Sequence, residues 1–383
     1  MKFALVAGET SGDLLAGLLL DGLKTKWPQL QSFGIGGARM TERGFAAWWP
    51  SDKLAVRGYI EVLRHYREIV GIRKQLKARL LASPPDVFIG VDAPDFNLDL
   101  ARDLKQVGIK TIQFVSPSIW AWRGERIHKI KKSVDHVLCI FPFEPALYAE
   151  HGISASYVGH PLASVIPLQP KRDMARKVLG LQEDDVVFAV LPGSRASEIQ
   201  YIGETFAEAV KLILDARPHL KVLVPAVPLL KSKIEMQLVG KLRPEQRAQV
   251  QVLQGQSHSA LAACDVSLVA SGTATLEAAL FKRPMVIAYK MNPLSWVMMR
   301  NKRYQAWVGL PNILCNDFVV PEFLQGAANP QALSNSVLAW LDSPERSAKV
   351  IARFTELHHE LLRDMQRLAA EDVAKVMAEE FRS

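Results

Sequence analysis

Cysteine is scarce in this chain of 383 residues, which contains only Cys139, Cys264 and Cys315. Their number is odd and they lie far apart, so we expect neither a disulfide framework nor a zinc-binding pattern. So few cysteines are typical of a reducing compartment. A chain of this length also buries enough apolar surface to fold without disulfides.

Uninterrupted apolar segments are short. No run of about 18 or more apolar residues occurs, so we expect no membrane-spanning helix. Residues 1–7 contain one lysine and a brief apolar run, too short for the apolar region of a signal peptide. We therefore expect a soluble cytoplasmic protein that contacts a membrane only from its surface.

Metal-binding patterns are missing as well. The chain contains no Asp-x-Asp and no histidine pair with metal-ligand spacing, so we expect no metal and no cofactor. With 49% hydrophobic and 22% charged residues it is not a disordered chain. Its net charge of +8 favours anionic partners: phosphates, nucleic acid or acidic lipid headgroups.

Short apolar, β-branched segments alternate with segments of helical periodicity along most of the chain. This alternation predicts an α/β protein whose parallel sheets are covered by helices on both faces. The predicted strands are residues 3–7, 86–91, 110–115 and 136–141, and then 186–191, 221–225, 250–253, 266–270 and 285–289.

A proline-containing segment, residues 159–170, interrupts the alternation and predicts a linker. We predict one doubly wound, Rossmann-like domain over residues 1–165 and a second over residues 166–345. Residues 346–383 are expected to form a C-terminal helical segment. Ligands of such domains bind at the carboxyl ends of the strands, and we expect the two domains to face a cleft.

Two loops of the second predicted domain suit a nucleoside diphosphate. Gly193, Ser194 and Arg195 follow one strand and precede a helix. A glycine there lets the backbone approach a phosphate, the helix N-terminus offers N–H groups, and arginine is a forked cation. The alternative is an ordinary capped helix with a solvated arginine.

The second loop repeats this arrangement. Ser271, Gly272 and Thr273 follow a strand and open a helix, with Glu277 about one turn inside. Glu277 could accept two hydrogen bonds from a ribose, or it could simply be solvated. Two such loops in one domain favour a nucleotide-diphosphate site, although neither matches a P-loop or a dinucleotide fingerprint.

Carboxylates follow two strands of the first predicted domain. Glu9 lies in a glycine-containing turn, and Asp92 and Asp95 follow the strand at residues 86–91. Each is a candidate general base. Asp95 also suits the N-cap of a helix beginning near Phe96, which is the interpretation we favour, so Asp92 is the preferred base. In the second domain, Asn312 could donate to a substrate oxygen or close a turn.

Three stretches combine basic and apolar residues with helical spacing, which suits an anionic membrane surface. A solvated basic face is the alternative for each, and no nucleic-acid motif is present. The candidate membrane or acyl-chain contacts are Arg57, Arg64, Arg67, Trp296, Met299 and Arg300.

Taken together and in order, the loops resemble those of the lipid-A-disaccharide synthase family. Each motif alone is weak, but the ordered set covers nearly the whole chain. The segments that carry the resemblance are residues 7–13, 92–97, 115–123, 191–195, 270–277 and 310–312.

The resemblance implies a GT-B glycosyltransferase that inverts the anomeric centre and needs no metal. Its donor would be UDP-2,3-diacylglucosamine and its acceptor 2,3-diacylglucosamine 1-phosphate, lipid X. The products would be the β-1,6-linked lipid A disaccharide 1-phosphate and UDP. Because the substrates are acylated, the enzyme would lie at the inner face of the cytoplasmic membrane, bound peripherally to its anionic surface.

The resemblance also implies roles for the loop residues. A carboxylate, with Asp92 preferred over Asp95 and Glu9, would take the proton of the acceptor 6-hydroxyl. Glu9 and Asn312 would position substrate. Departing UDP would be stabilised by Arg195 and by the N–H groups of Gly193, Ser194, Gly272 and Thr273, with Glu277 on the ribose.

Two other functions stay open. One is another GT-B transferase that uses a UDP-amino sugar and a lipid-linked acceptor, distinguished by an unacylated donor. The other is a non-catalytic nucleotide- or nucleic-acid-binding protein; we expect no nucleic-acid partner. The oligomeric state also stays open, a homo-oligomer included.

Overall fold

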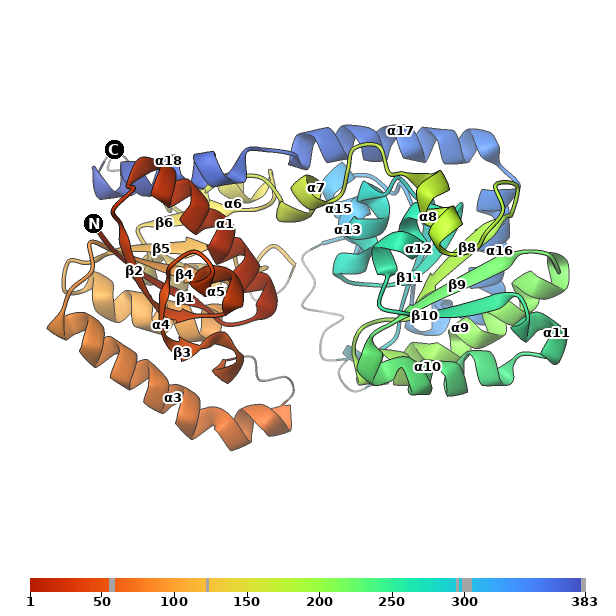
Figure 1. Ribbon diagram of the computed structural model, residues 1–383, viewed down its shortest axis with the longest axis horizontal. Coiled ribbons are helices and arrows are strands. Elements are labelled where there is room, and N and C mark those ends of the chain that lie inside the picture. The colour runs from red at the N-terminus through yellow and green to blue at the C-terminus, as the bar shows by residue number, and fades with distance from the viewer. Residues whose placement is uncertain (55–58, 122–123, 294–295, 298–304, 380–383) are drawn as a thin grey trace. The chain divides into compact units, whose positions relative to one another are not determined.

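The computed structural model describes residues 1–54, 59–121, 124–293, 296–297 and 305–379; the side chains of residues 59–65 are also left undescribed. The chain forms two compact units (Figure 1). The first contains Met1–Pro161 and Leu361–Ser383, and the second contains Leu162–Glu360. Each unit is a parallel sheet with helices on its faces, as the sequence predicts.

The sheet of the first unit has seven strands in the order β3-β2-β1-β4-β5-β6-β7. All neighbouring strands are parallel. The strands are β1 (Lys2–Ala7), β2 (Gln31–Gly36), β3 (Ala46–Pro50), β4 (Val87–Val91), β5 (Lys110–Phe114), β6 (His136–Cys139) and β7 (Ala155–Tyr157).

Helices cover both faces of this sheet and create two apolar cores. One core joins the sheet to the first and last helices of the unit, and the other joins it to the remaining long helices. The helices are α1 (Thr10–Lys26), α2 (Ala38–Thr41), α3 (Tyr59–Ala82), α4 (Pro94–Lys105), α5 (Arg126–Ser133), α6 (Glu144–Ala149) and α18 (Met365–Met377).

The second unit has a six-stranded parallel sheet in the order β10-β9-β8-β11-β12-β13. Its strands are β8 (Val187–Leu191), β9 (Lys221–Ala226), β10 (Val250–Gln254), β11 (Val266–Ala270), β12 (Met285–Tyr289) and β13 (Glu322–Leu324). Its helices are α8 (Arg172–Val178), α9 (Ala196–Ala216), α10 (Lys231–Gln237), α11 (Pro244–Arg247), α12 (Ser257–Ala263), α13 (Thr273–Leu280), α15 (Leu310–Cys315) and α16 (Pro330–Leu341).

The segment predicted as a separate C-terminal piece is divided between the two units. Helix α17 (Pro344–Leu361) runs along the second unit up to Glu360, whereas α18 packs on α1 in the first. A Cβ at Gly22 of α1 would lie 2.1 Å from the Gln366 carbonyl oxygen, so only glycine permits this close approach. The predicted linker contains a short helix, α7 (Pro161–Val165), with proline at its first position.

Each sheet has a point where the strand order reverses, and ligands of doubly wound folds bind there. In the first unit this point lies between β1 and β4, and in the second between β8 and β11. The loops that leave these four strands carry Glu9, Asp92, residues 192–195 and residues 271–273. The fold therefore places four of the predicted loops at ligand-binding positions.

Candidate nucleotide and catalytic sites

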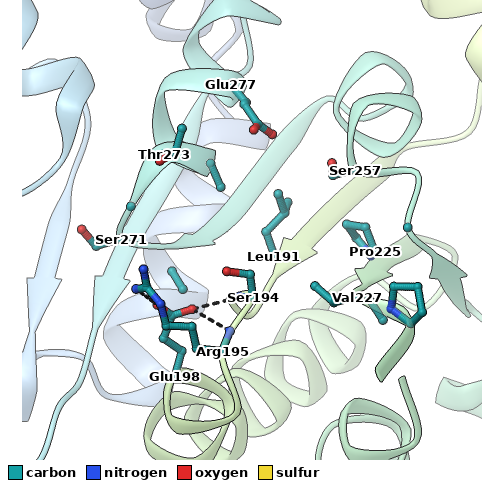
Figure 2. A pocket seen from close by; sticks show the side chains of 17 residues that line it. Leu191, Ser194, Arg195, Glu198, Pro225, Val227, Ser257, Ser271, Thr273 and Glu277 are labelled. Carbon is teal, nitrogen blue, oxygen red and sulfur yellow. Dashed lines mark hydrogen bonds and ion pairs between the residues drawn. The ribbon is translucent and has the colours of Figure 1, made fainter. Parts of the chain in front are cut away.

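A pocket of about 410 Å³ opens in the second unit at the carboxyl ends of β8 and β11 (Figure 2). The end of β9, the loops after β9 and β10 and the start of α12 complete its wall, contributing Pro225, Val227, Gly255 and Ser257. Every residue predicted for the nucleotide lines this one pocket: Gly193, Ser194, Arg195, Ser271, Gly272, Thr273 and Glu277.

Two glycines shape the pocket through backbone conformations that L-residues rarely adopt. Gly193 has φ +113° and Gly272 has φ +141°. A Cβ at Gly193 would also lie 2.5 Å from the Glu198 Oε2 atom. Glycine is therefore required in the turn after β8 both for its φ and for space, and in the turn after β11 for its φ.

Glu198, which the sequence analysis did not single out, holds the first loop (Figure 2). Its Oε2 atom accepts hydrogen bonds from the N–H groups of Ser194, at 2.9 Å, and Arg195, at 3.2 Å. Its Oε1 atom accepts from Arg195 Nη1 at 2.9 Å. The Glu198 carboxylate thus already occupies the N-terminus of α9. The Ser194 N–H group, which is predicted to stabilise departing UDP, donates to Glu198 in this structure.

The three-residue spacing of Arg195 and Glu198 is the sequence signal for this contact, since a glutamate at the third helical position reaches back to the N-cap backbone. The Arg195 side chain is 74% exposed, so it can turn from Glu198 towards a ligand.

The N-terminus of α13 has no comparable side-chain cap. Its N-cap is Gly272, and the N–H and hydroxyl groups of Thr275 both donate to the Gly272 carbonyl oxygen. The N–H groups of Thr273 and Ala274 lie in the first turn, where no intrahelical partner exists. This helix N-terminus therefore offers the backbone donors that an anion needs.

Glu277 lies one turn further along α13 and lines the same pocket. Burial raises the pKa of its carboxyl group, while His258 acts in the opposite direction. The His258 Nε2 atom is 3.6 Å from Glu277 Oε2. A half-buried carboxylate here is placed to accept hydrogen bonds from ligand hydroxyl groups.

In the first unit, Asp92 directly follows β4, and it and Ala93 are left-handed, with φ +52° and +41°. Burial raises the pKa of the Asp92 carboxyl group; the Ala93 N–H group opposes this, and the charge of Glu9 raises the pKa further. Glu9 is the exposed N-cap of α1, and its side chain makes no capping hydrogen bond. The structure thus brings these two carboxyl groups into the same electrostatic environment.

Asp95 does not serve as the N-cap, so the favoured interpretation of this residue is wrong. Helix α4 begins at Pro94, with Ala93 as its N-cap, which puts Asp95 in the first turn. There a carboxylate is favourable because of the helix dipole. Its side chain is 80% exposed and pairs with Arg126 Nη2 at 2.7 Å.

Asn312 is fully buried, and both ends of its amide are used within the unit. Its Nδ2 atom donates to the Val320 carbonyl oxygen and to Glu322 Oε1, at 2.9 and 2.8 Å. Its Oδ1 atom accepts from the N–H groups of Val319 and Val320. The structure therefore supports the turn-closing alternative over direct donation to a substrate.

Replacing Asn312 by alanine is expected to lower the free energy of unfolding by about 3 kcal/mol or more, because several buried backbone groups lose their partners. Urea denaturation measures this loss. The exposed Asn335 of α16 is the matched control, and its alanine variant should stay within about 0.5 kcal/mol of the parent. Equal stability of the two variants would contradict the structural role.

The structure describes only some of the residues predicted to contact the membrane. Arg57, Met299, Arg300 and the side chain of Arg64 lie outside the described residues. Arg67 is exposed on α3 beside Tyr66, and Trp296 is half-buried. In the described part of the chain, no helix has the length and apolar character needed to cross a membrane.

A family model described as lipid-A-disaccharide synthetase matches residues 3–377. The chain belongs to this family. It is 62% identical to the lipid-A-disaccharide synthase of Albidiferax ferrireducens over 382 residues, 98% of this chain and 97% of that protein. The identity to the synthase of Verminephrobacter eiseniae is 57% over 383 residues, 99% and 98% of the two chains. The resemblance inferred from the loops is confirmed, and the protein is a glycosyltransferase of lipid A biosynthesis.

Solved structures share the fold at low sequence identity. The UDP-GlcNAc 2-epimerase of Neisseria meningitidis, bound to UDP-GlcNAc, has a TM-score of 0.64 at 12% identity, covering 99% of this chain and all of that one (100%). MurG of Acinetobacter baumannii has a TM-score of 0.57 at 12% identity, covering 98% and 99%. The GT-B fold, with two Rossmann-like domains, is thereby confirmed.

Proposed function

We propose that this enzyme transfers 2,3-diacylglucosamine from its UDP derivative to the 6-hydroxyl of 2,3-diacylglucosamine 1-phosphate. The products are the β-1,6-linked disaccharide 1-phosphate and UDP. Membership of the lipid-A-disaccharide synthase family supports the substrates. The observation that carries the proposal is the pocket at the reversal point of the second sheet, which collects every residue predicted for the nucleotide.

The diphosphate of the donor would bind at the N-terminus of α13, with Arg195 beside it. The helix supplies N–H groups and Arg195 supplies a cation, which together suit a leaving group whose negative charge grows. Glu277 would accept hydrogen bonds from the ribose. A similar fold binds UDP-GlcNAc in the Neisseria meningitidis epimerase, which supports a UDP-sugar in this pocket.

The reaction would be a single displacement with inversion. Asp92 takes the proton of the acceptor hydroxyl while its oxygen bonds to the anomeric carbon. The bond from that carbon to the diphosphate oxygen breaks, and UDP leaves with the electron pair. Arg195 would exchange Glu198 for the diphosphate when the donor binds, because the two side chains are paired in the structure.

The direct test incubates the protein with both acylated substrates and EDTA, and measures UDP release and disaccharide formation. Turnover that persists in EDTA is expected, because Arg195 and the α13 N-terminus take the place of a metal. Absence of turnover, together with transfer from unacylated UDP-N-acetylglucosamine to a lipid-linked acceptor, would replace this proposal with the related transferase.

The affinity for UDP is expected to fall as the pH is lowered, starting at a higher pH than for an ordinary glutamate. The pKa of Glu277 is raised, and only its ionised form accepts hydrogen bonds with both oxygens. Glu277→Gln should bind UDP about tenfold more weakly near neutral pH and show a flatter pH dependence. Both proteins are titrated with UDP by calorimetry, and the difference between them is free of the ionisation of UDP itself, which is the same in both experiments. Parallel curves would contradict the role of Glu277.

Peripheral binding to the inner face of the cytoplasmic membrane is part of the proposal, because both substrates carry acyl chains. We expect the protein to sediment with anionic vesicles at low salt and to be released at high salt. Arg67→Glu should weaken this binding, whereas Lys349→Glu on the exposed face of α17 makes the same charge change as a control. No sedimentation at low salt would contradict peripheral membrane binding. Equal effects of the two variants would contradict α3 as the contact.

A further inference from the structure

The turns after β4 and β5, two neighbouring strands of the first unit, are both held in unfavourable backbone conformations. Asp92 and Ala93 are left-handed after β4, and Val115 has φ +71° after β5. A β-branched residue at positive φ is a rare outlier, and the alanine side chain can form no local hydrogen bond that would stabilise that conformation. Such conformations persist only where the surroundings enforce them, and they cluster at functional sites.

Two buried amides enforce these turns. Asn97 Nδ2, from α4, donates to the Asp92 carbonyl oxygen at 2.9 Å. Gln113 Nε2, from β5, donates to the same oxygen at 3.0 Å and to the carbonyl oxygens of Phe114 and Val115, both at 3.3 Å. Neither amide side chain has any exposed surface. One carbonyl oxygen thus receives two side-chain donors, and Gln113 links it to the strained turn of the next strand.

The sequence makes room for this pair at Gly90, which lies opposite Gln113 in the register of β4 and β5. A Cβ at Gly90 would lie 2.7 Å from the Asn97 Cβ atom and 3.0 Å from Gln113 Oε1. Asn97 Oδ1 and Gln113 Oε1 accept no hydrogen bond within the described part of the chain. The two amides are therefore oriented so that their N–H groups donate to the Asp92 carbonyl oxygen, although their own oxygens then lack a hydrogen-bond donor.

We propose that Asn97 and Gln113 are positioning residues for Asp92. By holding its carbonyl oxygen they fix the left-handed peptide, and with it the direction in which the Asp92 carboxyl group projects from the strand end. This inference rests on the proposed role of Asp92 as the general base. Neither amide touches substrate, and both act through the backbone of that residue.

The test compares Asn97→Ala and Gln113→Met with the control Thr111→Val. Thr111 is also fully buried on β5, but near its other end, where its hydroxyl donates to the Ser133 carbonyl oxygen at 3.0 Å. All three variants lose a buried hydrogen bond and should lose thermal stability. Only the first two should also lower kcat, by roughly ten- to a hundredfold, because a misplaced base costs rate.

Two readouts separate positioning from mere stability. The KM for the UDP-sugar should change less than about twofold, because the donor pocket is built by the second unit. Hydrogen–deuterium exchange should accelerate in the peptide that contains Asp92 and Ala93 in both amide variants, but not in Thr111→Val. Gly90→Ala, which pushes on both amides, should reproduce both effects.

The inference is overturned if the amide variants match Thr111→Val in kcat per folded molecule, or if the exchange near Asp92 does not change. An inactive parent protein would instead refute the proposed transferase activity. In that case the exchange measurement alone decides whether the two amides hold the turn, so the two failures are distinguishable.

Discussion

Asp92→Asn should lower kcat by about 10²–10⁴-fold, the usual contribution of general base catalysis. Asparagine has nearly the same shape, and the carbonyl oxygen of residue 92 can still accept from Asn97 and Gln113, so the turn should persist. Only the proton acceptor is removed. Steady-state rates with both acylated substrates measure the loss, and circular dichroism checks the fold.

Asp95→Asn is the matched control, because Asp95 is exposed and paired with Arg126. Its effect should stay within a few-fold. Near-normal turnover of Asp92→Asn would contradict the assignment and transfer the role of base to Asp95 or Glu9. Large losses in both variants would point to a requirement for negative charge rather than to one base.

The pH profile gives the same assignment an independent check. A base must be ionised, so kcat/KM falls when the pH drops below its pKa. Burial and the neighbouring Glu9 raise the pKa of Asp92, so this acid limb should lie at a higher pH than for an ordinary aspartate. Glu9→Gln removes one raising charge and should shift the limb to lower pH.

The sequence does not predict β2, β3, β7 or β13. It predicts the other strands of both sheets within two residues at each end, because each is a short segment rich in apolar and β-branched residues between loops. Strands β7 and β13 have only three residues each, too few for a periodicity. Strand β2 contains Gly34 and Gly36, which suggest a turn, yet Gly34 is needed because a Cβ there would lie 2.1 Å from the Leu5 carbonyl oxygen.

Local composition does not locate the start of α1. The segment Thr10–Asp13 has the residues of a turn, but the helix begins at Thr10. Gly12 lies inside the helix on the side of the sheet, where a Cβ would be 3.5 Å from the Val91 carbonyl oxygen, an ordinary contact distance. Asp13 then accepts N–H groups from residues 37, 39 and 40, which caps α2. These are tertiary contacts, so no sequence window contains them.

The candidate site is predicted better than its internal hydrogen bonds. Loops after parallel strands meet at one edge of a sheet, so the pocket follows from topology and motif alone. The hydrogen-bond partner of a single polar group depends on which of the side chains within reach the folded chain brings to it. Glu322, ten residues from Asn312, engages that amide, and Glu198 occupies the Ser194 N–H group.

Replacing Arg195 by alanine should lower kcat/KM by about 10²–10³-fold, the typical cost of one donor to a developing negative charge. Arg195→Lys should recover only part of the loss, because an ammonium group lacks the fork that matches two phosphate oxygens. The control is Arg217→Ala at the other end of α9, an exposed arginine paired with Asp342. Equal losses at the two ends of the helix would contradict a role for Arg195 in the transition state.

Glu198 makes this prediction sharper, because it competes with the diphosphate for Arg195. Glu198→Gln removes the competing charge, while the glutamine oxygen can still accept from the N–H groups of Ser194 and Arg195. UDP should therefore bind this variant more tightly than the parent protein, as titration calorimetry would measure. Weaker binding would mean that Glu198 holds Arg195 in place for the ligand. When Glu198→Gln is combined with Arg195→Ala, the gain in affinity for UDP should become smaller, because the Arg195 side chain that the first substitution releases is absent.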